Sequence, residues 1–191
     1  MPLSQQLKDR VLNELVPKYP TKRAVLTMAL WLIQDEQGWI SVESCEELGD
    51  LLDLDPMDVR AVASFYSMFN SRPTGRKLLE VCHTHACLVN GAHRTMARLC
   101  EKLGLDPHSV EHGEATTPDG EYTVRYAECL AACDKPPAVQ VNYRYYGPIT
   151  EQNAEDFLAN MQKYNLEIPI DDPKARPAAG PGYAMSGVQP G

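Results

Sequence analysis

The first seventy residues repeat apolar positions at helical spacing, and a capping residue precedes each repeat. The pattern predicts four helices, with caps at Ser4, Thr21, Ser41 and Asp55. Pro17 and Pro20 are expected to end the first helix, and Gly38 the second. The residues expected to face inward are Leu7, Val11, Leu12 and Leu15, then Val25, Met28, Ala29 and Leu32, then Leu48, Leu51 and Leu52, and finally Val59, Val62, Phe65, Tyr66 and Phe69.

The helical spacing stops at residues 71–75, and a different pattern follows. A strand at 77–81 runs into Cys82, and a helix at about 91–103 ends at Gly104. Further strands are predicted near 109–114, 122–126, 138–141 and 144–146, with a turn at 118–120 and a last helix at about 151–164. A strand and helix followed by several short strands and a closing helix predict an α/β sandwich with a small mixed sheet.

These patterns divide the chain into three parts. Residues 1–73 are expected to form an N-terminal helical bundle, and residues 74–168 an α/β domain. In residues 169–191, Pro, Gly and Ala dominate and apolar periodicity is lost. We expect this tail to be flexible or to wrap around a partner.

Composition and charge narrow the class of protein. The chain has 191 residues, 43% of them hydrophobic, with a net charge of −8 and a pI near 5.1. An acidic chain is poorly suited to bind nucleic acid or anionic membranes. The longest apolar run, residues 24–33, is too short to cross a bilayer, and the first ten residues lack the apolar core of a secretory signal. We therefore expect a cytoplasmic protein whose cysteines are reduced and free to bind metal.

Four cysteines occur as two close pairs, Cys82-x4-Cys87 and Cys129-x3-Cys133. Four thiolates suit either zinc or an iron–sulfur cluster. The gaps are wider than those of the usual zinc knuckle and favour a two-iron cluster with a pair of cysteines at each end. In the predicted topology each pair follows a strand, so both loops leave the sheet at neighbouring ends. A cluster held there lies near the surface, where it can exchange electrons with a docked partner.

The chain resembles a known family, the thioredoxin-like 2Fe–2S subunit of respiratory NADH:quinone oxidoreductase. This enzyme is also called bacterial complex I. The resemblance covers roughly residues 5–165. The segments that carry it are VCHTHACLVNG at 81–91, ECLAACDKPPAVQVN at 128–142, Tyr19-Pro20, QDEQGWI at 34–40 and VASFYSMF at 62–69.

The resemblance implies a thioredoxin-like ferredoxin domain in which Cys82, Cys87, Cys129 and Cys133 ligate one 2Fe–2S cluster. It implies that a partner subunit carries FMN and the NADH site, and that further complex I subunits complete a peripheral arm on the cytoplasmic side, without membrane insertion by this chain. Single electrons would pass between the cluster and the FMN. This chain would have no complete active site, and we assign it no catalytic residue, since it has neither a G-x-G-x-x-G nor a Walker sequence.

Other assemblies use the same cysteine motif. NAD-dependent hydrogenases and formate dehydrogenases contain equivalent diaphorase subunits, and the motif does not separate them from complex I. A zinc-binding scaffold is a further alternative. His83 and His85 are unusual between the first two cysteines; they are either solvated loop residues or groups that raise the cluster potential.

Two further features of the sequence allow other interpretations. Residues 40–69 resemble a helix-turn-helix, but seven acids and no base lie between Glu43 and Asp58, which is the wrong charge for a surface that faces phosphate. Cys45 and Cys100 have no closely spaced partner cysteine and are expected to be small core residues.

Overall fold

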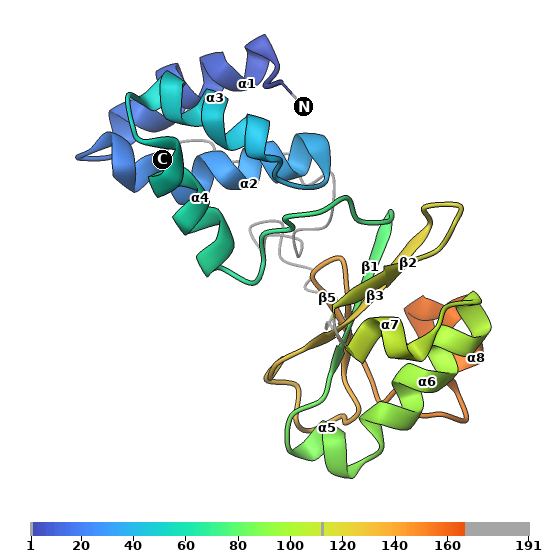
Figure 1. Cartoon of the computed structure of the whole chain (residues 1–191). Coiled ribbons are helices and arrows are strands. Elements are labelled where there is room, and N and C mark those ends of the chain that lie inside the picture. Colours follow the sequence, from blue (N-terminus) through green and yellow to red (C-terminus); the bar gives the residue numbers. More distant parts are fainter. Residues whose placement is uncertain (1, 112, 167–191) are drawn as a thin grey trace. The chain divides into compact units, whose positions relative to one another are not determined.

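The computed structural model describes residues 2–111 and 113–166, which form two compact units divided between Pro73 and Thr74 (Figure 1). The first unit is helical and the second contains a mixed sheet, so the predicted α/β class is confirmed. The predicted tail at 169–191 lies outside the described residues. Within the described part of the chain, no helix has the length and apolar character needed to cross a bilayer.

In the described part of the first unit, Ser4, Ser41 and Asp55 cap α-helices as predicted, whereas Thr21 caps a 3-10 turn that leads into the second helix. The helices are α1 (Gln5–Arg10), α2 (Leu26–Gln37), α3 (Val42–Leu52) and α4 (Pro56–Phe65), with a π-helical stretch at Val11–Leu15 and 3-10 turns at Val16–Lys18 and Lys22–Val25. Each capping oxygen accepts a backbone N–H, Ser4 from Leu7, Thr21 from Ala24, Ser41 from Ser44 and Asp55 from Met57. Gly38 ends α2 with φ +80°, a conformation that suits glycine.

The core of the first unit contains most of the predicted inward residues, with three exceptions. Leu12 is 40% exposed, although its neighbours Val11 and Leu15 are buried. Phe65 is 79% exposed and Tyr66 is 38% exposed, so the prediction that they face inward is wrong. Phe65 is the last residue of α4 and lies about 120° around the helix from buried Val59, so it does not share the buried side. The backbone becomes extended at Tyr66, which breaks the helical spacing before Phe69.

The second unit is built on a five-stranded sheet. The strands are β1 (Lys77–Cys82), β2 (Glu114–Thr116), β3 (Tyr122–Ala127), β4 (Val139–Val141) and β5 (Arg144–Tyr146), in the order β2-β3-β1-β4-β5. β1 and β3 are parallel, and the other neighbouring strands are antiparallel. The parallel register pairs Cys82 with Ala127, so both strands end at the same edge of the sheet.

Helices pack on the sheet of this unit around one apolar core. They are α5 (Ala86–Val89), α6 (Ala92–Leu103), α7 (Pro107–Glu111) and α8 (Ala154–Ala159), followed by a 3-10 turn at Met161–Tyr164. Met96 and Leu99 of α6 and Phe157 of α8 are buried together with Leu79 and Val81 of β1. Burial of these side chains supplies much of the stability of the unit.

Two predicted elements of the second unit are corrected. The strand expected near 109–114 is wrong, since α7 occupies residues 109–111 and β2 begins only at Glu114. Asp106 accepts the N–H of His108 at 3.0 Å and Pro107 follows it, so an Asp-Pro pair starts this helix as another starts α4. The predicted last helix is divided at Asn160, whose φ is −134°, into α8 and the 3-10 turn.

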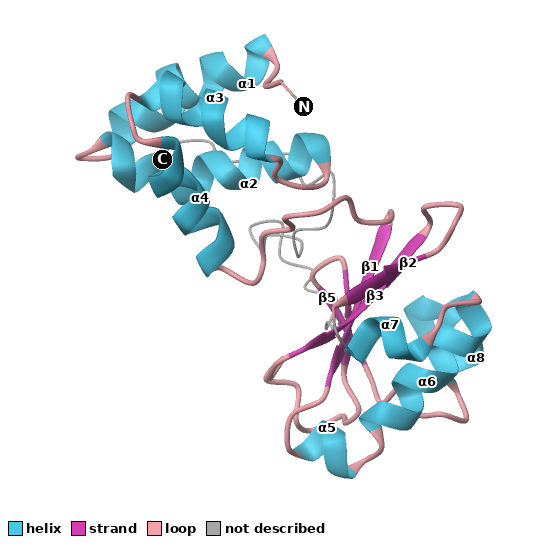
Figure 2. Cartoon of the chain, viewed as in Figure 1, coloured by secondary structure: helices cyan, strands magenta, loops and turns pink. Residues whose placement is uncertain are grey.

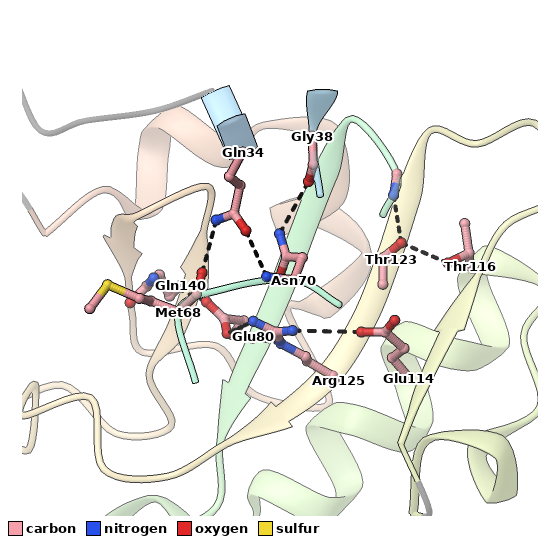
Figure 3. Close-up of polar contacts among 11 residues, drawn as sticks. Gln34, Gly38, Met68, Asn70, Glu80, Glu114, Thr116, Thr123, Arg125 and Gln140 are labelled. Carbon is pink, nitrogen blue, oxygen red and sulfur yellow. Dashed lines mark hydrogen bonds and ion pairs between the residues drawn. The ribbon is translucent and has the colours of Figure 1, made fainter. Parts of the chain in front are cut away.

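Figure 3 includes a polar network that joins adjacent strands of the sheet. Arg125 of β3 donates to Glu80 of β1 from Nε at 3.0 Å and from Nη2 at 2.7 Å. Gln140 of β4 donates to the other oxygen of Glu80 at 3.0 Å, and Arg125 forms an ion pair with Glu114 of β2 at 3.6 Å. Glu80 and Arg125 are register partners in β1 and β3, so their contact helps to fix the register of the parallel pair.

Asp156→Asn is expected to reduce the acid sensitivity of the second unit. The pKa of Asp156 lies well below its ordinary 3.8, because its carboxylate accepts hydrogen bonds from Lys163, Tyr164 and Asn160. A lowered pKa in the folded state gives stability that is present above the ordinary pKa and is lost as the pH falls through the folded-state value. In urea unfolding at about pH 5.5 and about pH 3, the wild type should lose more free energy of unfolding than the variant. Equal losses would contradict this role for Asp156.

Candidate metal centre

The first cysteine pair lies where β1 ends. Cys82 is the last residue of β1 and Cys87 lies in α5, and both are almost completely buried. The turn between them is tight, because the N–H of Cys87 donates to the carbonyl of Thr84 at 3.0 Å and His85 has a φ of +32°. This turn brings the two thiols close enough for Cys82 to raise the pKa of Cys87.

The second cysteine pair lies in the loop that follows β3. Cys129 and Cys133 are both exposed, and they lie close enough for the charge of Cys129 to raise the pKa of Cys133. Ala131, between them, has a φ of +57°, in the left-handed region that bends the loop. Because β1 and β3 are parallel, this loop leaves the sheet at the edge where α5 lies (Figure 2).

The two pairs are close enough to influence each other. Burial raises the pKa of Cys87 to about 11, and the charges of Cys82 and Cys133 also raise it. The N–H of Ala138, which donates to Cys87 Sγ at 3.4 Å, lowers this pKa and offsets part of the shift. The pKa of Cys133 is raised first by the charge of Cys129, and also by that of Cys82. Thiolates from both loops therefore repel one another, and a cationic centre between them would favour their ionised forms.

The donor set fits a 2Fe–2S cluster. Four sulfur ligands match the soft-ligand preference of iron–sulfur centres, and a backbone N–H directed at Cys87 Sγ is the kind of contact that stabilises an anionic cluster. In residues 2–111 and 113–166, no group of three or more His, Cys, Asp or Glu side chains is arranged to hold a metal ion. The cysteines instead form two pairs, and in a 2Fe–2S cluster each iron is ligated by one pair of cysteines.

One feature beside the cysteines has no signal in the sequence. The ring of His83 stacks on Tyr126 at 4.8 Å, and His93 Nδ1 lies 2.9 Å from the Tyr126 hydroxyl. His93 lies in α6 and Tyr126 in β3, so only the fold brings them together. His85 is exposed and is not among the residues in this stack.

The two remaining cysteines are core residues. Cys45 is buried in the core of the first unit and Cys100 in the core of the second. Burial raises the pKa of both thiols, that of Cys100 to about 11. The prediction that both are core residues is confirmed.

Known proteins resemble this chain over most of its length. The model of the thioredoxin-like [2Fe-2S] ferredoxin family matches residues 12–162. An NADH-quinone oxidoreductase subunit of Thermus thermophilus is 38% identical over 158 residues, covering 81% of this chain and 84% of the relative. An NADH-quinone oxidoreductase subunit of Mycobacterium bovis is 36% identical over 169 residues, covering 88% of this chain and 62% of the relative.

Among solved structures, an NAD+-reducing [NiFe]-hydrogenase in the H2-reduced state is similar to this chain. The TM-score is 0.60 at 21% identity, and the match covers 81% of this chain but 24% of the hydrogenase chain. At this identity the likeness concerns the fold alone. The arrangement of helices and sheet described above thus recurs in a longer protein chain.

Proposed function

We propose that this chain is an electron-transfer subunit of an NADH:quinone oxidoreductase. The chain belongs to the thioredoxin-like [2Fe-2S] ferredoxin family. Cys82, Cys87, Cys129 and Cys133 would ligate one 2Fe–2S cluster. The cluster would exchange single electrons with the FMN of a partner subunit that also binds NADH. The relatives at 36% and 38% identity support this assembly over an NAD-dependent hydrogenase or formate dehydrogenase.

The observation that carries the proposal is that the two cysteine pairs follow β1 and β3, two parallel strands that end at the same edge of the sheet. The pairing of Cys82 with Ala127 places the start of the second loop beside the end of β1. When bound, the cluster supplies one-electron redox chemistry at a potential set by its charge and hydrogen bonds.

The proposed cluster site has one buried end and one exposed end. Cys82 and Cys87 are 3% and 2% exposed, so their end is shielded from water by the core of the second unit. Cys129 and Cys133 are exposed, so their end is open to a docking partner. The N–H of Ala138 offsets part of the negative charge at the buried end. Such an arrangement suits a subunit that passes electrons and performs no proton transfer or bond cleavage of its own.

The partner and location follow from the same proposal. FMN and NADH would be bound by the partner, and further subunits would connect the pair to quinone reduction. The chain would lie in the peripheral arm of a membrane-bound complex, on its cytoplasmic side. The subunits that co-purify with the chain distinguish the assemblies, since nickel–iron or molybdenum subunits would indicate a hydrogenase or a formate dehydrogenase.

The function is tested by reduction with NADH in the presence and absence of the partner. The purified chain alone should not be reduced by NADH. Addition of the flavin subunit should produce the paramagnetic signal of a reduced 2Fe–2S cluster in this chain. Reduction of the isolated chain by NADH, or no reduction with the flavin subunit in place, would be incompatible with the proposed electron transfer.

A further inference from the structure

Three aromatic rings pack together beside the cysteine loops. The ring of His83 lies over that of Tyr126, with the centroids 4.8 Å apart and the planes inclined by 27°. His93 meets Tyr126 edge-on at 5.4 Å, and its Nδ1 is 2.9 Å from the Tyr126 hydroxyl. The rings of His83 and His93 are 6.3 Å apart. We name His83, Tyr126 and His93 the ring stack, since each ring packs against the other two.

Each member of the ring stack belongs to a different segment next to a cysteine. His83 directly follows Cys82, and Tyr126 lies in β3, three residues before Cys129. His93 lies in the first turn of α6, the helix that follows the cysteine-bearing α5. The ring stack therefore connects the three chain segments that carry or lead to the cysteines of the proposed cluster.

The sheet places His83 and Tyr126 on the same face. Val81 and Tyr126 are register partners in β1 and β3, and side chains alternate between the two faces along a strand. His83 comes two residues after Val81, and its N–H donates to the carbonyl of Ala127 at 3.3 Å. This hydrogen bond continues the pairing beyond the end of β1. The backbone pairing of the two strands therefore brings these two rings together.

The second cysteine loop has no regular structure to hold it in place. No helix or strand lies in residues 128–138, all of which are described. Tyr126 is the last but one residue of β3, so its contacts with His83 and His93 fix the point at which this loop begins. A loop that is held at its end has less conformational entropy to lose when its cysteines bind metal.

An ion pair explains the position of His83 less well than the stacking does. Nε2 of His83 is 4.0 Å from the carboxylate of Glu128, and the side chain of Glu128 is 92% exposed. A long, exposed pair of this kind contributes little to the folded structure. The stacked ring of Tyr126 is half-buried, and offset stacking at this distance is favourable.

We propose that the ring stack positions the two cysteine loops relative to each other, so that their four thiolates can bind one shared metal cluster. The proposal rests on the proposed function for the identity of that cluster. His83 and Tyr126 are positioning residues, which act through the cysteines and do not ligate iron themselves. By restraining both loops before metal binds, the stack reduces the conformational freedom that is lost on binding and slows the release of metal afterwards.

The test measures how fast iron leaves the full-length, anaerobically purified chain in the presence of excess iron chelator. His83→Ala and Tyr126→Leu should each release iron about two- to tenfold faster than the wild type, the range expected for loss of one aromatic pair. His83→Phe should release iron at the wild-type rate, because a phenyl ring can stack on Tyr126. Combining His83→Ala with Tyr126→Leu should add little to the larger single effect, since both changes remove the same contact.

Electron paramagnetic resonance of the reduced chain gives a second readout. Loops that are free to vary hold the cluster in a range of geometries, so the signal should be broader in His83→Ala and Tyr126→Leu than in the wild type and His83→Phe. His85→Asn is the matched control. His85 lies in the same turn and is exposed, its ring is outside the stack, and asparagine tolerates its φ of +32°. This variant should match the wild type in both measurements.

Two results would overturn the role of the ring stack. One is wild-type iron release and signal width in both His83→Ala and Tyr126→Leu. The other is equally fast release from His83→Phe and His83→Ala, because the imidazole itself would then matter and not the stacking. Hydrogen exchange of the His83 amide in the cluster-free chain, relative to amides in the middle of β1, should be faster in Tyr126→Leu. A wild-type chain without iron would defeat the proposed function, while this exchange rate would still decide whether the stack restrains the loops.

Discussion

Cys129→Ser is expected to remove most of the iron from the purified chain while leaving the fold of both units intact. Cys129 is exposed in the loop after β3, so the substitution creates no cavity and leaves no polar group buried. A serine hydroxyl is a poor substitute for a thiolate as a ligand of iron. Iron content and the visible spectrum after anaerobic purification measure the effect. Cys133→Ser should behave in the same way.

Two comparisons sharpen this result. Cys45→Ala should keep the full iron content, because Cys45 lies in the core of the other unit. Cys82→Ser and Cys87→Ser should lose the cluster and also destabilise the second unit, since each places a hydroxyl in the apolar core. A Cys129→Ser chain that retains its iron would refute the assignment of this residue.

Phe157→Ala is expected to lower the free energy of unfolding of the second unit by about 3 to 5 kcal/mol. Phe157 is fully buried, and its ring packs against Tyr146 at 5.5 Å and Tyr164 at 5.9 Å, so its removal leaves a cavity beneath α8. Hydrogen exchange of amides in β1 and β3 reports the loss, because these strands exchange only when the unit opens.

The control for this variant is Val89→Ala, since Val89 is 84% exposed and should be nearly neutral. Amides of α2 and α3 serve as an internal reference, because they belong to the other compact unit. A change of less than about 1 kcal/mol in the second unit would mean that Phe157 does not support its core.

Local signals in the sequence predicted much of the fold, because capping and turn chemistry act over a few residues. The caps Ser4 and Asp55 and the stop at Gly38 are observed, and so is the turn before β3 with Gly120 at φ +67°. The prediction of secondary structure failed where the sequence was compatible with both a strand and a helix. At 109–114 a strand was expected on one side of the turn at 118–120, although Val110 is the only large apolar residue there and the preceding Asp106-Pro107 pair is a helix start of the same kind as that of α4.

Contacts between distant segments could not be derived in the same way. The periodicity that placed Tyr66 inward assumes that α4 continues past Phe65, and the change of backbone at Tyr66 has no marker such as glycine or proline nearby. The contact of His83 and His93 with Tyr126 depends on how α6 and β3 are packed.

For the cysteines, spacing alone indicated two pairs. That both pairs follow strands ending at the same edge of the sheet depends on the parallel pairing of β1 with β3, a long-range property that spacing does not contain.

The central claim is that sulfur atoms of Cys82, Cys87, Cys129 and Cys133 hold a pair of iron ions. Quantification of iron, zinc and acid-labile sulfide in the anaerobically purified chain, together with electron paramagnetic resonance after one-electron reduction, tests it most directly. We expect two irons and two sulfides per chain, the composition of the family's cluster, and a paramagnetic signal that appears only on reduction. A colourless chain that contains zinc, or one with neither sulfide nor signal, would contradict it.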